Sequence, residues 1–301
     1  MHLPILSRRK LWFALSGALI AASLACTAIF GLNFGIDFTG GSLVEVRFEN
    51  PPSVDALRQT LQDAGYGYVT VQTTQGTDAL MRLEHLDEAG HQALLETLRT
   101  AHGSVDELRF DSIGPSIGAE LRRNAVISVV LTLVLIGIYV AWAFRKVSEP
   151  VASWKYAVLT VLTAFHDVII PVGVFAVLGR FFGWQVDTTF VAAVLTILGY
   201  SINDTIVVFD RTRENLTRPH HGEAFEETVE RSIKETLTRS FNTGFAALLA
   251  LAAISIWGGE TTRPFALALI IGIAVGTYSS IFIASPLLVE FDKWTKREKK
   301  A

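Results

Sequence analysis

Cysteine and net charge are both scarce in this chain of 301 residues, which has one Cys and a formal net charge of −3. The single cysteine, Cys26, excludes an internal disulfide, and we expect it to be an ordinary apolar helix residue. The 26 Lys and Arg nearly balance the 29 Asp and Glu and form no dense basic patch, which disfavours nucleic acid as a partner.

Charge is also nearly absent from six long apolar stretches. They cover residues 11–36, 124–144, 156–179, 188–209, 240–259 and 264–289. Together they contain none of the 26 Lys and Arg and only two of the 29 Asp and Glu, Asp167 and Asp204. A helix that crosses the roughly 30 Å hydrocarbon layer of a membrane needs about 20 such residues. The pattern predicts an α-helical polytopic membrane protein with six transmembrane helices, and it excludes a soluble enzyme.

The basic residues predict how these helices are oriented. Seventeen of the 26 Lys and Arg lie before the first stretch, between the second and third, between the fourth and fifth, or after the sixth. The two short loops on the other side hold only Arg180 and Arg263. Short cytoplasmic loops carry the positive excess. We therefore expect both termini, residues 1–10 and 290–301, and the loop 210–239 to be cytoplasmic.

The first stretch could also be read as a signal peptide, because the basic residues Arg8, Arg9 and Lys10 precede it. The apolar run that follows is too long for a signal peptide. We predict an uncleaved transmembrane helix over 11–32 and the other five helices within 124–289.

The segment 33–123 is the only one large enough to fold by itself, and we expect it on the extracytoplasmic side. Ser53 and Asp87 are residue types that cap helices, and each precedes a run with leucines on one face. Alternating residues predict four strands, at 42–48, 66–73, 77–83 and 105–110. The resulting βαββαβ order predicts a ferredoxin-like domain, with both helices on one face of a four-stranded sheet.

Two details of this segment carry further expectations. The second and third strands are expected to be joined by a turn around Gln75-Gly76. The histidines His85, His91 and His102 lack the spacing of metal ligands, so we expect no metal site.

Asp204, in the fourth stretch, is the main candidate functional residue, because an ionised carboxylate in hydrocarbon costs roughly 3 kcal/mol or more. Burial favours its neutral form and a nearby cation favours the charged form, which is how a reversible proton carrier is built. Tyr200 and Ser201 precede it on the same helical face, and Asn203 is its neighbour. The alternative is an Asp that reaches the membrane surface or only packs.

Arg239 is the candidate cation, because the fifth stretch is short and gains a full turn if its helix begins near Thr236. Asn242 and Thr243 follow on the same face and extend a polar stripe into an otherwise apolar helix. The alternative is an ordinary basic anchor at the cytoplasmic surface.

The third stretch carries His166 and Asp167 near its middle. Pro171 removes the backbone donor that would have bonded the carbonyl of Asp167, so a kink and a polar pocket are expected to coincide there. The His-Asp pair could relay protons or form a static hydrogen bond between helices, and the sequence leaves both open.

Two other patterns predict packing rather than chemistry. The run 223–237 has an apolar residue every four positions and predicts a helix that lies along the cytoplasmic interface. The sixth stretch repeats small residues, which predicts close helix packing. These small residues are Ala268, Gly272, Gly276, Ser280 and Ala284.

Four short motifs stand out along the chain. They are Gly35-Ile36-Asp37-Phe38-Thr39-Gly40-Gly41, Gly114-Pro115-Ser116-Ile117-Gly118, His166-Asp167, and Gly199-Tyr200-Ser201-Ile202-Asn203-Asp204-Thr205-Ile206-Val207-Val208-Phe209-Asp210-Arg211. Together with the six apolar stretches they closely resemble the SecF branch of the SecD/SecF family, in the RND superfamily. The resemblance covers nearly the whole chain and implies an RND-like half-bundle of six helices in the bacterial cytoplasmic (inner) membrane.

In that family a SecD–SecF pair uses the proton motive force to draw preproteins out of the Sec channel. For this chain the resemblance implies a transport subunit, not an enzyme, with no cofactor and the proton gradient as its energy source. The implied partners are SecD, the SecY/SecE/SecG translocon, YajC and unfolded preproteins. The family's membrane Asp and its cytoplasmic-edge Arg fall on Asp204 and Arg239.

Two alternatives of other classes remain. An RND-type proton-coupled small-molecule exporter would be expected to have a much larger domain after the first helix and a second six-helix half. A non-catalytic membrane assembly factor would not need Asp204 within the membrane.

Overall fold

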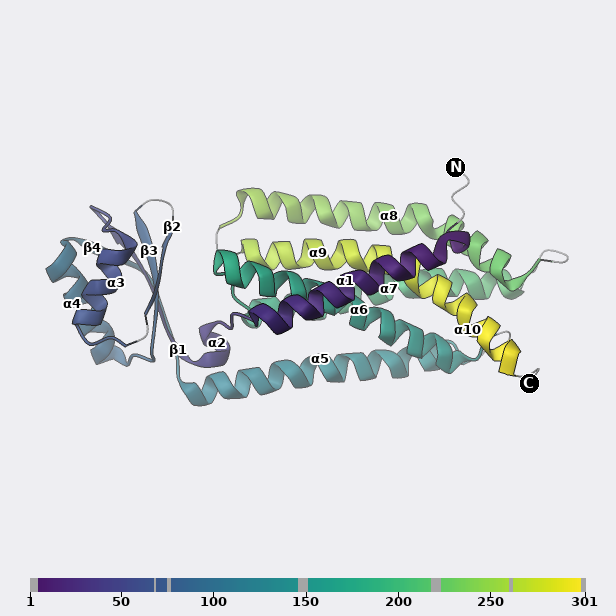
Figure 1. The fold of residues 1–301 in the computed structure, drawn as a ribbon, viewed down its shortest axis with the longest axis horizontal. Helices are drawn as coiled ribbons and strands as arrows, with labels where there is room; N and C mark the ends of the chain where they lie inside the picture. Colours follow the sequence, from purple (N-terminus) through teal and green to yellow (C-terminus); the bar gives the residue numbers. More distant parts are fainter. Residues whose placement is uncertain are drawn as a thin grey trace. The chain divides into compact units, whose positions relative to one another are not determined.

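The computed structural model describes residues 5–67, 69–74, 77–145, 151–217, 223–259 and 262–298. Contacts divide the chain into two compact units, each considered by itself below. We call Met1–Asn33 with Ile127–Ala301 the helical unit, and Phe34–Val126 the sheet unit. Figure 1 labels the elements of both.

The sheet unit has four antiparallel strands in the spatial order β2-β3-β1-β4. The strands are β1 (Gly41–Phe48), β2 (Thr70–Thr74), β3 (Asp78–Leu83) and β4 (Val105–Ile113). Helices α3 (Val54–Asp63) and α4 (Glu88–His102) cover the same face of the sheet (Figure 1), and the short helix α2 (Ile36–Thr39) precedes β1. The predicted βαββαβ ferredoxin-like order is confirmed.

The core of the sheet unit follows from the alternation of the strands and the helix period. Val44 and Met81 are partners in the β1–β3 register, and both are fully buried. Leu57 of α3 and Leu94 and Leu98 of α4 pack against them in one apolar cluster. The sequence pattern therefore places one face of each helix on one face of the sheet.

Both predicted helix caps are present. Ser53 Oγ accepts a hydrogen bond from the backbone N–H of Ala56 at 3.2 Å, and Asp87 Oδ1 accepts one from Gly90 at 2.8 Å. The second strand was predicted to begin at Tyr66, but it begins at Thr70. The N–H of Tyr66 instead bonds the carbonyl of Leu61 and closes the end of α3. The predicted turn at Gln75-Gly76 lies outside the described residues.

The two glycine motifs of the sheet unit pack against each other. Gly40 has φ +73°, and a Cβ added to it would lie 2.9 Å from Pro115 Cα. A Cβ added to Gly118 would lie 2.8 Å from the backbone nitrogen of Gly40. The backbone just before β1 therefore lies directly against the backbone at the start of α5, and a side chain at either glycine would push these two segments apart.

Among the residues that the structure describes, six helices are long and apolar enough to cross a membrane, as predicted. They are α1 (Arg9–Phe30), α5 (Pro115–Ala143), α6 (Ser153–Phe182), α7 (Thr188–Thr217), α8 (Phe225–Trp257), and α9 (Arg263–Ser279) continued by a π-helical segment (Ser280–Ala284) into α10 (Ser285–Glu298). Several extend beyond the charge-free stretches, because Lys, Arg and Glu favour helix outside hydrocarbon as well.

The region predicted as the cytoplasmic loop 210–239 is mostly helical. Helix α7 continues to Thr217 and α8 begins at Phe225. The run 223–237, predicted as a separate helix along the interface, is instead the first part of the uninterrupted helix α8. Nothing in its sequence stops the helix before the apolar stretch begins, since it lacks Gly and Pro.

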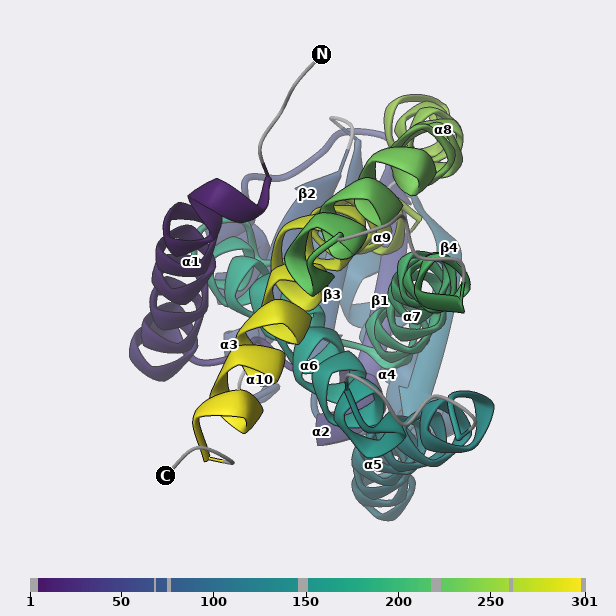
Figure 2. The same cartoon turned by 90° about the vertical axis from the view of Figure 1, so that its right-hand side faces the viewer.

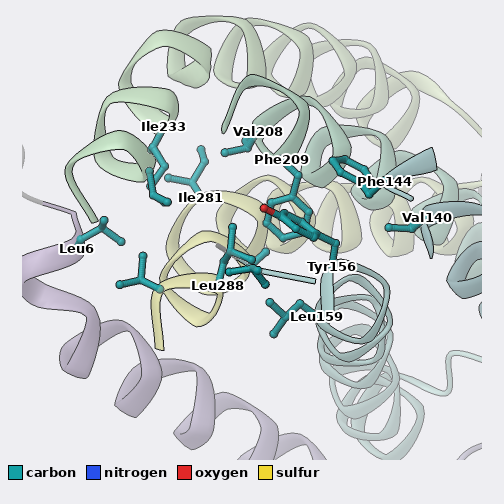
Figure 3. Close-up of a cluster of buried hydrophobic side chains, with 14 of the residues drawn as sticks. Leu6, Val140, Phe144, Tyr156, Leu159, Val208, Phe209, Ile233, Ile281 and Leu288 are labelled. Carbon is teal, nitrogen blue, oxygen red and sulfur yellow. The ribbon is translucent and has the colours of Figure 1, made fainter. Parts of the chain in front are cut away.

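Within the helical unit, α9 lies at the centre. It contacts α6, α7 and α8, and the end-on view of Figure 2 shows it between them. The small residues predicted to serve packing let α9 approach its neighbours closely, since a Cβ added to Gly272 would lie 2.2 Å from Ile197 Cδ1 of α7. The helical unit also has an apolar cluster in which Tyr156, Phe209, Ile233 and Leu288 pack together (Figure 3).

Candidate functional site

Asp204 lies in the middle of α7 and is 7% exposed. Its nearest polar neighbours come from two other helices: the hydroxyls of Ser240 in α8 and Ser280 in the π-helical segment flank the carboxylate. Neither Asp204 Oδ2 nor Ser240 Oγ has a hydrogen-bond partner within the described residues. The site is therefore a buried carboxylate whose acceptor capacity is only partly used.

Arg239, the candidate cation, directly precedes Ser240 in α8. No ion pair joins the two side chains among the residues that the structure describes, and Arg239 is exposed. Asn203 and Asn242 are exposed as well. The structure thus brings Tyr200 and Ser201 inward but leaves these three polar side chains on the outside of the helical unit.

His166 and Asp167 form a second buried polar cluster. His166 Nδ1 lies 2.8 Å from Asp167 Oδ1, and Asp167 is 0% exposed. The other oxygen, Oδ2, accepts hydrogen bonds from Ser201 of α7 and, at 2.8 Å, from Ser279 of α9. Helix α6 continues through Pro171. The carboxylate of Asp167 therefore ties α6 to both neighbouring helices, as the static alternative expects.

The two carboxylates are linked through neighbouring hydroxyl residues. Ser279 bonds Asp167, while the next residue, Ser280, shares a 2.8 Å hydrogen bond with Thr205, the neighbour of Asp204. On α7, Ser201 bonds Asp167 one turn before Asp204. A change in the packing of α7 against α9 would therefore alter the surroundings of both acids.

The π-helical segment Ser280–Ala284 lies beside Asp204 and was not predicted. Ser285 Oγ bonds the carbonyl of Ser280 at 3.0 Å, five residues back. Pro286 follows; it cannot donate to the carbonyl four residues earlier and it crowds that carbonyl, so a regular α-helix is interrupted here. Pro286 with Ser279, Ser280 and Ser285 was the sequence signal for this segment, and such segments are frequent at functional sites.

No group of three or more His, Cys, Asp or Glu side chains in the described ranges of the chain could hold a metal ion. The polar groups around Asp167 and Asp204 are instead serine and threonine hydroxyls, the two carboxylates and the His166 ring. Such groups accept and donate protons and can bind water, and this is the chemistry that the arrangement offers.

Two family models match this chain. The model described as protein export membrane protein SecD/SecF, C-terminal, matches residues 93–294. The model described as the SecD/SecF GG motif matches residues 27–52, which include the first glycine motif.

Curated relatives match over nearly the full length. The protein translocase subunit SecF of Thermobaculum terrenum is 41% identical, and the alignment covers 96% of this chain and 94% of the relative. The SecF subunit of Sebaldella termitidis is 39% identical over 99% of this chain and 96% of the relative. The protein translocase subunit SecDF of Thermus thermophilus is 38% identical over 95% of this chain, but over 38% of its own length.

Solved structures show the same fold. A crystal structure of SecDF from Thermus thermophilus, titled a translocon-associated membrane protein, matches with a TM-score of 0.84 at 36% identity, covering 97% of this chain and 39% of that one. A second SecDF structure, in a super-membrane-facing form, matches with a TM-score of 0.70 at 36% identity, over 99% and 40% of the two chains. This chain thus spans about two fifths of the length of these structures.

Proposed function

Because this chain belongs to the SecD/SecF family of protein-export membrane proteins, and thus takes part in Sec-dependent protein translocation, we propose that Asp204 couples this translocation to proton movement. The single observation that carries the proposal is the buried carboxylate of Asp204, which has an oxygen without a partner among the described residues and lies in the middle of a membrane-spanning helix.

The physical argument concerns the cost of the charged state. Apolar surroundings disfavour an ionised carboxylate, while the positive charge of Arg239 favours it. If α7 and α8 move closer together, Arg239 can reach inward and pair with ionised Asp204; if they separate, the neutral acid is favoured. Proton uptake and release would thus accompany two arrangements of these helices.

The family also suggests how the chain is assembled and oriented. In the relatives named SecDF, a single chain carries the names of both SecD and SecF, and the present chain matches 38–39% of its length. This supports SecD as the partner. Unfolded preproteins are the proposed substrates, and the SecY/SecE/SecG channel and YajC are further proposed partners. The chain is a multi-pass membrane protein; we place it in the bacterial inner membrane with both termini cytoplasmic and the domain 33–123 on the other side. The proton gradient replaces any cofactor.

Protein translocation is favoured over small-molecule export. The relatives that match nearly the whole chain are named protein translocase subunits. A non-catalytic assembly factor is disfavoured by Asp204, because a carboxylate with an unused acceptor is costly in a membrane-spanning helix and stabilises nothing there.

The test is Asp204→Asn in membranes that lack the native protein. The amide mimics the neutral acid, so proton-driven export should be lost, while the level of the protein and its binding to SecD remain as in wild type. Export is measured in inverted vesicles with and without a pH gradient. Thr196→Ala, at an exposed position of the same helix where the hydroxyl bonds only the carbonyl of Ala192, is the matched control and should behave as wild type. Proton-driven export near wild type in Asp204→Asn would refute the proposal.

A further inference from the structure

Three tryptophans are exposed at the end of the helical unit where α5 ends and α6 begins. They are Trp142 in α5, Trp154 in α6 and Trp294 in α10, and they are 60%, 52% and 54% exposed. Arg145 lies over the ring of Trp142, 4.4 Å from its centroid, and Lys155 Nζ lies 5.6 Å from the ring centroid of Trp154. Tryptophans beside cations are typical of the level at which membrane-spanning helices meet water.

The three helices that carry these tryptophans lie against one another at this end. The end of α5 stacks on the start of α6, with the ring centroids of Phe144 and Tyr156 5.0 Å apart. Lys155 donates a hydrogen bond to Thr295 of α10, and its Nζ lies 5.9 Å from the ring centroid of Phe291 in the same helix. Figure 2 shows α10 beside α6. We call Trp142, Arg145, Trp154, Lys155, Trp294 and Arg297 the tryptophan–cation surface.

The cations of the tryptophan–cation surface differ from others at the same end of the helical unit. Within the described ranges, Arg145, Lys155 and Arg297 form no ion pair with a carboxylate, and Arg145 and Arg297 are exposed. By contrast, three cations at the end of α7 and the start of α8 each pair with an Asp or Glu. They are Arg211, Arg213 and Lys234. The positive charge of the tryptophan–cation surface is therefore not neutralised by the chain itself.

Lys155 gives this surface its strongest demand for an anion. The residue is only 7% exposed, and the partner of its ammonium group on α10 is the neutral hydroxyl of Thr295. The carboxylate of Asp292, on the same helix, pairs instead with Lys296 at 2.6 Å. A cation withdrawn from water is costly unless an anion lies close to it. An anion that approaches from the membrane surface would therefore be bound here.

We propose that the tryptophan–cation surface binds the headgroups of anionic phospholipids. The lipid phosphate supplies the negative charge that Arg145, Lys155 and Arg297 lack. The tryptophan rings have an apolar body and a polar N–H, which suits the boundary between headgroup and acyl chain. An acidic protein segment would meet the charge but would not account for three exposed tryptophans. A lipid bound here holds α5, α6 and α10 together, and this role does not depend on Asp204.

Lipid binding to the complex with SecD, measured by native mass spectrometry, tests the charge. Phosphatidylglycerol should be retained in preference to phosphatidylcholine. Arg145→Gln with Arg297→Gln, at two exposed positions, should weaken phosphatidylglycerol binding about tenfold or more, since each cation near a membrane surface contributes about fivefold. Arg211→Gln with Arg213→Gln removes the same charge from paired cations and is the matched control. An equal loss of binding in both double variants would overturn the proposal.

Thermal unfolding tests the part of Lys155. Phosphatidylglycerol should raise the Tm of the wild-type protein. In Lys155→Met, which keeps an unbranched side chain without the charge, this increase should be clearly smaller, whereas Lys155→Arg should keep it. Each increase is measured against the same variant without lipid, so a change in basal stability does not affect the comparison. The full wild-type increase in Lys155→Met would remove Lys155 from the surface.

Quenching of tryptophan fluorescence tests whether lipid is the occupant. In phosphatidylcholine vesicles, a small fraction of brominated phosphatidylglycerol should quench more than the same fraction of brominated phosphatidylcholine. This difference should shrink in Trp154→Phe with Trp294→Phe but not in Trp257→Phe, whose ring is 81% exposed at the far end of α8. Equal quenching by both lipids would refute the proposal. A difference that is present for the chain alone and absent in its complex with SecD would assign the surface to a protein partner instead.

Discussion

Asp167 and Asp204 are both buried carboxylates in membrane-spanning helices, but their surroundings differ. Asp167 has hydrogen-bond partners in His166, Ser201 and Ser279, which use both of its oxygens. Asp204 Oδ2 has none among the described residues. A carboxylate whose oxygens both accept hydrogen bonds holds its donors in place, whereas one with an unused oxygen can take a further donor without breaking a bond. The two residues are therefore assigned different roles.

Asp167→Ala should lower the free energy of unfolding by about 2–4 kcal/mol, because it leaves the buried donors of His166 and Ser201 without their acceptor and removes one of the two acceptors of Ser279. Asp204→Asn should leave the free energy of unfolding near that of wild type. Thermal unfolding in detergent measures the stability of both variants.

Asp167→Asn and His166→Ala should reduce proton-driven export less than Asp204→Asn does. An export defect as complete as that of Asp204→Asn, in a protein of normal stability, would instead assign Asp167 to the proton path.

Asp78 gives the sheet unit a predictable dependence on pH. Its two oxygens accept hydrogen bonds from Arg47 Nε and Nη2, each at 2.8 Å, across the β1–β3 register. These bonds lower the pKa of Asp78. A lowered carboxyl pKa adds stability that is complete above the ordinary value, near 4, and is lost as the pH falls through the lower value of the folded protein.

We therefore expect β1 and β3 to lose protection from hydrogen exchange progressively as the pH falls below about 5 and through the lowered pKa of Asp78, after correction for intrinsic rates. In Asp78→Asn this pH-dependent part should be absent. Asp55→Asn is the control, because its side chain is 92% exposed on α3. The same pH dependence in Asp78→Asn as in wild type would contradict the assignment.

At the scale of elements, the contact between α7 and α9 is what places the site. Gly272 and Gly276 let α9 approach Ile197 and Ser201 of α7. Ser279, at the end of α9, then bonds Asp167, and Ser280, the first residue of the π-helical segment, bonds Thr205. The small residues were predicted to serve packing. Their further effect is to bring the hydroxyls of one helix to the acids of two others.

Gly272→Ala should destabilise the helical unit by about 1–3 kcal/mol, because the added Cβ overlaps the side chain of Ile197. Thermal unfolding in detergent is the measurement, and Gly199→Ala is the control because its Cβ meets nothing within 4 Å. The companion change Ile197→Val with Gly272→Ala should recover part of the loss. A variant as stable as the control would show that this contact is not tightly packed.

At the scale of the whole molecule, the outer surface of the helical unit is incomplete for a protein surrounded by lipid. Arg239, Asn203 and Asn242 are exposed on membrane-spanning helices. Polar side chains facing lipid are costly, so a protein surface is expected to cover them. The SecDF relatives point to SecD as that surface.

The chain should therefore copurify with SecD in mild detergent as a stable complex. Asn203→Trp, which adds a bulky side chain on the exposed face of α7, should weaken this complex, whereas Leu131→Trp on the exposed face of α5 should not. Recovery of a monodisperse, fully active chain without SecD would contradict the prediction.

The six membrane-spanning helices, the βαββαβ order and the two helix caps could be predicted from the sequence, because absence of charge, alternation and capping are properties of neighbouring residues. The sequence also singled out Asp167 and Asp204, since a carboxylate in an apolar stretch is visible without a fold. The pairing of Asp204 with Arg239 stays a prediction. Three facts required the folded structure: Ser201 bonds Asp167, Ser240 and Ser280 flank Asp204, and the run 223–237 continues into α8. These facts depend on which helix faces meet, and side-chain volumes far apart in the sequence fix that.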